Sequence, residues 1–177
     1  MIFIDGSNLH WGLRMYNGEN QTDIRIDYNK LVTLLAKGRS VIRVIFYCSK
    51  PVPPGRVSQI KFLDYLRSLG MQVVEKPLKI RSGPPGRIQA SNQNIRYVEK
   101  GIDVALATDL IGMAWEDAYD TAVLVSGDAD YTGAINKVMS KGRNVEVASF
   151  RNFLSKELRE AALAKTILDD FMLQIKV

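Results

Sequence analysis

A chain of 177 residues, of which 46% are apolar and 24% charged, has the size and composition of one globular domain with a buried core, so we expect a single domain over residues 1–177. It has no apolar run of about 18 residues and no basic stretch or cleavage site at its start, which argues against membrane insertion and export. Its single cysteine, Cys48, excludes an internal disulfide and indicates a reducing compartment, so we expect a cytoplasmic protein.

Five apolar runs bounded by polar residues are typical of strands buried in a parallel sheet. In chain order they are Met1–Ile4, Val41–Tyr47, Met71–Val74, Thr121–Val125 and Val145–Ala148. Helical periodicity fills the gaps between them. One helix follows the capping residue Asp27, and a second ends before Gly70.

The second half of the chain continues this alternation. A helix is expected from Ile102 to about Trp115, and its inward face is expected to carry Val104, Ala107, Ile111 and Ala114. Another helix runs from about Asp130 to Gly142, and residues 155–177 are expected to form one or two closing helices. Strands that alternate with helices predict a three-layer α/β fold, a mostly parallel sheet flanked by helices, with its motifs in residues 1–148.

The segment from Pro77 to Arg96 interrupts this rhythm, because the prolines and glycines at its centre predict a turn outside the sheet. Six cations and one acid lie between Lys76 and Lys100, so this stretch alone accounts for the net charge of +5. Such a basic surface suits a polyanion, although a solvated loop is the alternative. The cations expected to contact phosphates are Arg81, Arg87, Arg96 and Lys100.

Acidic residues follow two of the predicted strands. Asp5 ends the first, in Ile4-Asp5-Gly6-Ser7-Asn8, and Asp128 and Asp130 follow the fourth, in Ser126-Gly127-Asp128-Ala129-Asp130. Asp103 opens the helix that begins near Ile102. Because ligands gather at the carboxyl ends of parallel strands, we expect these four carboxylates to meet there.

Carboxylates brought together repel one another unless a cation lies between them, so the cluster predicts a metal site. Oxygen ligands without a nearby histidine or second cysteine favour Mg²⁺ or Mn²⁺ over Zn²⁺. Each acid also has a purely structural interpretation, because a single Asp at these places can cap a helix or brace a turn. All three places would have to be structural at once for the metal to be absent.

Other polar residues are expected to support these acids. Asn8 is a candidate to orient a carboxylate or a bound phosphate, with helix capping as the alternative. Ser126 and Thr108 are candidates to donate hydrogen bonds in the site, although either can serve the local backbone. Asp109 lies about 240° around a helix from Asp103, so we expect it to assist the site rather than to share one ion.

Three blocks of residues occur in a fixed order along the chain. They are Ile4-Asp5-Gly6-Ser7-Asn8, Lys100-Gly101-Ile102-Asp103-Val104 through Thr108-Asp109-Leu110, and Ser126-Gly127-Asp128-Ala129-Asp130-Tyr131. Together they resemble the NYN domain, and more narrowly its LabA-like branch. The resemblance implies a PIN-like fold and metal-dependent cleavage of RNA, with Asp5, Asp103, Asp128, Asp130 and Asn8 at the family's positions. Tyr131 stands where the family often has phenylalanine, a difference that we do not expect to affect metal binding.

A metal-dependent ribonuclease is therefore the expected function, and two other classes stay open. One is a catalytically weak RNA-binding or regulatory module with the same fold. The other is an adhesion-type metal-binding domain, since Asp5-Gly6-Ser7 begins like such a site, but Leu9 stands where its next serine belongs. The aromatic residues considered for base stacking are Trp11, Tyr16, Tyr97 and Tyr131. Apolar residues near the end, Phe171 to Leu173, leave a homodimer open.

Overall fold

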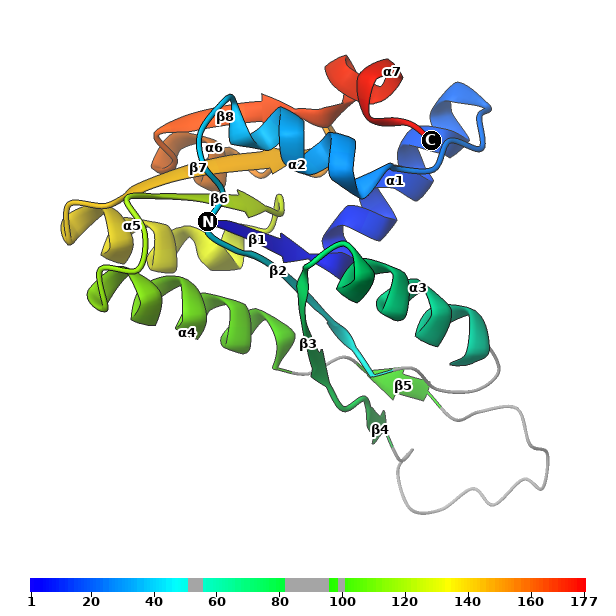
Figure 1. Ribbon diagram of the computed structural model, residues 1–177, viewed down its shortest axis with the longest axis horizontal. Helices are drawn as coiled ribbons and strands as arrows, with labels where there is room; N and C mark the ends of the chain where they lie inside the picture. Colours follow the sequence, from blue (N-terminus) through cyan, green and yellow to red (C-terminus); the bar gives the residue numbers. More distant parts are fainter. Residues whose placement is uncertain (51–55, 82–95, 99–100) are drawn as a thin grey trace.

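A computed structural model of the chain describes residues 1–50, 56–81, 96–98 and 101–177 (Figure 1). Six parallel strands form the central sheet of these residues, in the order β3-β2-β1-β6-β7-β8. They are β1 (Ile2–Asp5), β2 (Val44–Ser49), β3 (Gln72–Lys76), β6 (Thr121–Val125), β7 (Asn144–Ser149) and β8 (Ala164–Ile167). The order reverses between β1 and β6, and open α/β sheets bind ligands beyond the carboxyl ends of the strands at such a reversal.

Helices cover both faces of this sheet (Figure 1). One face carries α1 (Gly6–Asn20), α2 (Tyr28–Ala36), α3 (Arg56–Ser68) and α7 (Met172–Ile175). The other carries α4 (Ile102–Trp115), α5 (Thr132–Ser140) and α6 (Lys156–Ala161). Short 3₁₀ turns, η1 (Ala129–Tyr131) and η2 (Leu168–Phe171), lead into α5 and α7. The three-layer α/β fold predicted from the sequence is confirmed.

The alternation of side chains along β1 decides the direction of its last residue. Ile2 and Ile4 are buried in the core formed with α1, α2 and α3. Phe3 is buried in the opposite core, with α4 and α5. Asp5 continues the series of Phe3, so its carboxylate lies at the end of the strand on the side of α4.

The expected inward face of α4 is right for Ala114, which is buried, and for Ala107 and Ile111, which pack partly buried against the core, but it is wrong for Val104. Val104 is 69% exposed, and besides Ala114 the helix buries Ile102, Leu106 and Leu110. Apolar residues occur on nearly every side of this helix, so the spacing alone allows more than one buried stripe. The packing of α4 on the sheet selects the stripe that is buried.

The expectation that residues 155–177 are only helical is also wrong. The strand β8 follows α6 and pairs with β7 from Glu146↔Ala164 to Ser149↔Ile167. It is the last strand in the order of the sheet and is only partly buried, so it needs no continuous apolar run. Its sequence therefore lacks the signal by which the inner strands are found.

The described ends of the segment predicted to leave the central sheet do not join that sheet. A separate antiparallel pair consists of β4 (Lys79–Arg81) and β5 (Arg96–Val98), in which Arg81 lies opposite Arg96. Arg87, the predicted turn and Lys100 lie outside the described residues. Two of the four cations expected to contact phosphates, Arg81 and Arg96, thus lie on this antiparallel strand pair.

A charged group on β7 is tied to the end of α2. The side chain of Glu146 is 11% exposed and accepts hydrogen bonds from Lys37 Nζ at 2.9 Å and from Arg39 Nη1 at 2.8 Å. Both cations follow α2, so these contacts fix its carboxyl end against the sheet. No helix in the described part of the chain has the length and apolar character needed to cross a lipid bilayer.

Candidate active site

Asp5 joins β1 to α1 at the reversal of the sheet. It is 4% exposed and caps α1, because its Oδ1 accepts a hydrogen bond from the backbone N–H of Asn8 at 3.0 Å. Its Oδ2 accepts from the hydroxyls of Ser126 and Tyr131, each at 3.2 Å. The buried carboxylate is thus held by donors from both halves of the chain.

The start of α1 lies directly against β2. A Cβ atom on Gly6 would come within 2.6 Å of the ring of Phe46 and 2.7 Å of the carbonyl oxygen of Tyr47. Only glycine allows the backbone to approach so closely. The Asp-Gly pair therefore lets the helix begin immediately after the strand and holds the carboxylate at the edge of the sheet.

The hydroxyl of Tyr131 connects Asp5 with Asp103. It lies 3.2 Å from Oδ2 of Asp5 and 3.3 Å from Oδ1 of Asp103, which is in the first turn of α4. A hydroxyl has one proton, so it can donate to only one of these carboxylates at a time. Residues predicted to converge from two distant segments thus share one donor.

The electrostatics of Asp5 reflect this arrangement. Burial raises its pKa, the hydrogen bonds from Asn8, Tyr131 and Ser126 lower it, and the charge of Asp103 raises it. The balance leaves the pKa of Asp5 above its ordinary value. The charged form of Asp5 is thus only partly compensated by the groups around it.

The loop after β6 brings Asp128 to the same edge. Gly127 N–H donates to Oδ1 of Asn8 at 3.0 Å, and the N–H of Asp128 donates to Oγ of Ser126 at 3.3 Å. A Cβ atom on Gly127 would lie 2.0 Å from the carbonyl oxygen of Phe153, so the loop requires glycine there. Two hydrogen bonds through Ser126 therefore connect the backbone of Asp128 to the carboxylate of Asp5.

The family comparison covers the residues of all three sequence blocks. The model of the NYN domain matches residues 1–169. The chain belongs to the NYN domain family. The predicted family is confirmed, and NYN domains belong to the PIN-like nuclease superfamily.

The individual relatives of this NYN domain share a low sequence identity with it. It is 27% identical over 162 residues to the "Low amplitude and bright protein LabA" of Synechococcus elongatus, a match that covers 90% of this chain and 78% of the relative and supports the LabA-like branch. It is also similar to the crystal structure of a protein of unknown function from Vibrio parahaemolyticus, with a TM-score of 0.70 and 20% identity. That match covers 99% of this chain and 94% of the other, and it shows the fold alone.

The remaining acids of this NYN domain lie less centrally. Asp128 caps η1, because its Oδ1 accepts from the N–H of Asp130 at 3.0 Å, and Asp130 itself is exposed. Asp109 accepts a hydrogen bond from the hydroxyl of Tyr47 at 2.8 Å, and Tyr47 lies beside Asp5 in the register of β1 and β2. Asp109 therefore supports the neighbouring strand.

Two residues take other positions than those expected. Thr108 is exposed and its hydroxyl donates to the carbonyl oxygen of Val104 at 2.6 Å, a contact within α4. Tyr131 was considered for base stacking, but it is 1% exposed and its hydroxyl contacts carboxylates. The hydroxyl that phenylalanine lacks is therefore part of the site in this chain. In the sequence, only the position of Tyr131 directly after Asp130 indicated that its hydroxyl lies in the site.

The donor set fits a divalent cation with oxygen ligands. Asp5 and Asp103 have only the one hydroxyl proton of Tyr131 between them. A cation would balance the charges of both carboxylates. Among the described residues no three Asp, Glu, His or Cys side chains already form a metal-binding group. A third ligand would have to come from the loop after β6, where Asp128 now uses an oxygen as a cap.

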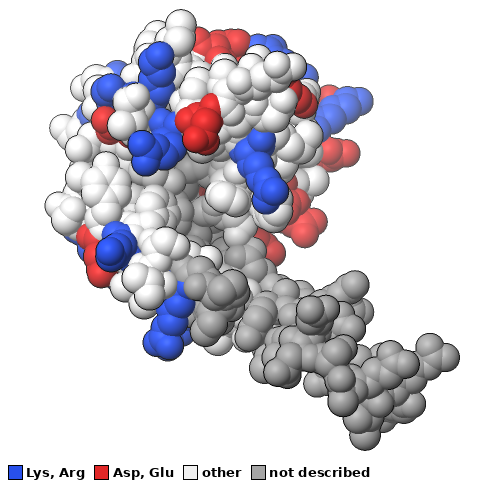
Figure 2. Space-filling view, turned by 90° about the vertical axis from the view of Figure 1, so that its right-hand side faces the viewer, with Lys and Arg blue, Asp and Glu red and all other residues white. Residues whose placement is uncertain are grey.

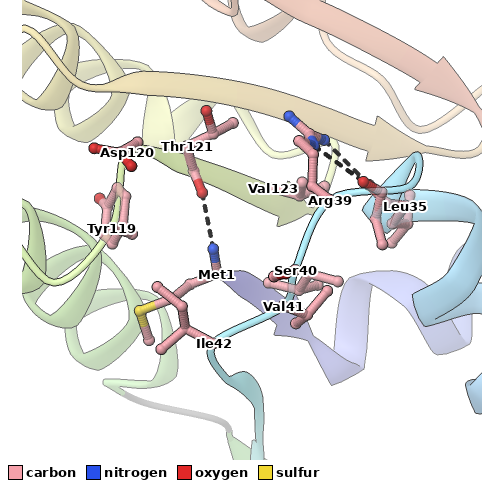
Figure 3. A pocket seen from close by; sticks show the side chains of 12 residues that line it. Met1, Leu35, Arg39, Ser40, Val41, Ile42, Tyr119, Asp120, Thr121 and Val123 are labelled. Atoms are coloured by element: carbon pink, nitrogen blue, oxygen red, sulfur yellow. Dashed lines mark hydrogen bonds between the residues drawn. The ribbon is translucent and has the colours of Figure 1, made fainter.

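A cavity of about 220 Å³ at the opposite edge of the sheet offers no comparable chemistry (Figure 3). It lies at the amino ends of β1 and β6, where the amino group of Met1 donates to the carbonyl oxygen of Thr121 at 2.8 Å. The acid among its lining residues, Asp120, has a side chain that is 93% exposed and pairs with Arg143. The carboxyl edge is therefore the better candidate.

Proposed function

We propose that this NYN domain is a metal-dependent ribonuclease that hydrolyses phosphodiester bonds in RNA. The observation that supports it most is the contact of Asp5 and Asp103 with one hydroxyl at the carboxyl edge of the sheet. Structural carboxylates are normally kept apart or paired with cations, whereas nuclease sites gather them. The nuclease superfamily of the domain points the same way.

In this proposal Mg²⁺ or Mn²⁺ is held by the carboxylates. Asp5 and Asp103 supply the core of the site, and Asp128 and Asp130 complete it from the loop after β6. When bound, such a cation activates a water molecule and stabilises negative charge on the phosphate oxygens. No histidine or cysteine ligand is needed.

Three polar residues position the carboxylates and the substrate in this proposal. Asn8 accepts from Gly127 through Oδ1, so its Nδ2 is the end of the amide that can donate to a phosphate oxygen. Ser126 holds Oδ2 of Asp5 and the N–H of Asp128 at once. Tyr131 keeps Asp5 and Asp103 at a fixed separation before a cation enters.

In this proposal the RNA strand is held by contacts that do not depend on its base sequence. Four cations between β4 and the start of α4 bind phosphates in this proposal, which gives affinity without base specificity. They are Arg81, Arg87, Arg96 and Lys100. A cytoplasmic location, a single domain and a homodimer remain predictions from the sequence.

The test uses Asp103→Asn, because Asp103 is exposed and its loss should leave the fold intact. We expect the wild type to cleave labelled single-stranded RNA with Mn²⁺ and to lose cleavage in EDTA. The variant should cleave about 100-fold more slowly or worse while still binding the strand. Asp120→Asn, at the opposite edge, is the matched control and should cleave like the wild type. Equal cleavage by Asp103→Asn and wild type would contradict the proposal.

One observation favours the alternative of an RNA-binding module. Asp128, the nearest third acid, uses its carboxylate to cap η1, and a module that only binds would keep that cap. In that case the wild type, Asp103→Asn and Asp120→Asn would bind the RNA equally and none would cleave it. Mn²⁺ would change neither the binding nor the cleavage.

A further inference from the structure

A second cavity lies between α1 and α3, at the carboxyl edge of the sheet. It has a volume of about 920 Å³, within the usual range of ligand sites of about 300–1,000 Å³. Residues of α1, α3 and the end of β2 line it, together with residues that precede α2. Trp11, Phe62, Tyr65, Arg25 and Lys50 are among them.

One part of this cavity is an aromatic wall. The rings of Tyr28 and Phe62 lie 5.6 Å apart, and each lies within 6.0 Å of the ring of Phe46. Phe62 is nevertheless 37% exposed, and Tyr65, one turn further along α3, is 44% exposed. Large aromatic surfaces held by their neighbours yet open to solvent are suited to stacking on flat ligands.

Trp11 stands on the α1 side of the cavity. It is 51% exposed, the guanidinium of Arg14 lies 5.2 Å from its ring centre, and the ring of His10 contacts it edge to face. An exposed indole beside a cation provides a base-stacking surface next to a phosphate-binding charge.

The charged side chains that line the cavity are basic. Arg25 and Lys50 line it, and the described side chains that line it include no Asp or Glu. Figure 2 shows this side of the molecule, where much of the surface is uncharged and both basic and acidic side chains lie around it. An apolar, aromatic cavity with a basic border suits an anionic ligand that carries flat rings.

The cavity reaches the edge of the sheet at which Asp5 lies. Gly6 and Ser7, which line it, directly follow Asp5 in the chain. The carboxylate site and the cavity therefore open at the same edge of the sheet.

We propose that this cavity binds a nucleobase of single-stranded RNA beside the cleaved phosphate. The inference rests on the proposed ribonuclease activity and assigns its substrate to the single-stranded class, because paired bases cannot enter a cavity between two helices. Trp11 stacks on the base, and Arg14, Arg25 and Lys50 hold the adjoining phosphates.

The test measures binding in EDTA, so that no cleavage interferes. Fluorescence anisotropy is recorded for the whole chain with a labelled oligouridylate and with an abasic sugar-phosphate strand of the same length. We expect the wild type to bind the base-bearing strand about tenfold more tightly. Trp11→Ala should remove most of this preference, and Trp11→Phe should retain it.

Trp115→Ala is the matched control. Trp115 ends α4, is 44% exposed and also lies beside cations, Lys137 and Lys141, but it does not line the cavity. This variant should keep the full base preference. The double variant of Arg25 and Lys50 to Ala should weaken both strands alike and lower the slope of affinity against salt by about two.

The two proposals can fail separately. Equal affinity of the wild type for both strands, or the same loss in the Trp11 and Trp115 variants, overturns the nucleobase site even if cleavage depends on Asp103. A base preference that needs Trp11, in a protein that never cleaves RNA, supports the cavity and overturns only the ribonuclease.

Discussion

The ion pair of Glu146 gives a quantitative test of the fold behind the site. Breaking a fully buried ion pair costs about 3–5 kcal/mol, and an exposed pair contributes about 0–1 kcal/mol. The side chain of Glu146 is 11% exposed, whereas those of Lys37 and Arg39 are 43% and 40% exposed and can return to water. We therefore expect Glu146→Gln to lower the free energy of unfolding by about 2 kcal/mol at neutral pH.

The loss should depend on pH. Burial by itself raises the pKa of Glu146, but the hydrogen bonds and charges of Arg39 and Lys37 outweigh it and hold the pKa below its ordinary value of 4.5. Because the pKa is lower in the folded state, the stabilisation is complete above 4.5 and disappears as the pH falls through the folded value. The wild type and the variant should therefore become equally stable in acid.

Urea unfolding followed by circular dichroism at a series of pH values measures both effects. The control is Glu160→Gln, in an exposed pair with Lys156 at 3.8 Å, which should change stability by less than about 0.5 kcal/mol. A difference between wild type and Glu146→Gln that stays constant from neutral to strongly acidic pH would refute the reasoning.

Three further outcomes are expected. Tyr131→Phe should lower the free energy of unfolding by about 1.5–3 kcal/mol, because its hydroxyl forms hydrogen bonds with charged carboxylates. Tyr119→Phe loses a hydrogen bond to a backbone carbonyl and should lower it by about 1 kcal/mol. Equal losses in denaturant titrations would contradict a hydroxyl shared by two carboxylates. Gly127→Ala should cost about 3 kcal/mol because of its clash, whereas Gly18→Ala, in open helix, should stabilise by about 0.5–1 kcal/mol. Mn²⁺ should raise the Tm of the wild type but not of Asp103→Asn, and equal shifts would exclude a site at Asp103.

Five of the six strands described in the central sheet, and the meeting of distant acids, were predictable because they follow from simple rules. Buried parallel strands need continuous apolar runs, and their carboxyl ends share one edge. Asp5 and the loop with Asp128 could therefore be placed together before any coordinates. The contact of Asp103 with the same hydroxyl agrees with that placement.

Other features depend on packing that spacing does not encode. Val104 was wrongly placed in the buried stripe of α4 because Val104 and Leu106 are both apolar, and only the packing on the sheet distinguishes them. The strand β8 lacks an apolar run because it lies at the edge. The bridging role of Tyr131 needs the distance between η1 and α4, and the α1–α3 cavity combines residues from several separate segments.

The reversal of the sheet also sets the order in which the site can form. The first strand emerges from the ribosome early, yet Ser126 and Tyr131, which hold the carboxylate of Asp5, are synthesised more than a hundred residues later. Until then β1 lacks its neighbour β6 and has one open edge. A nascent chain therefore carries the acid without the groups that orient it, and any activity of the site begins only after the second half has folded onto the first.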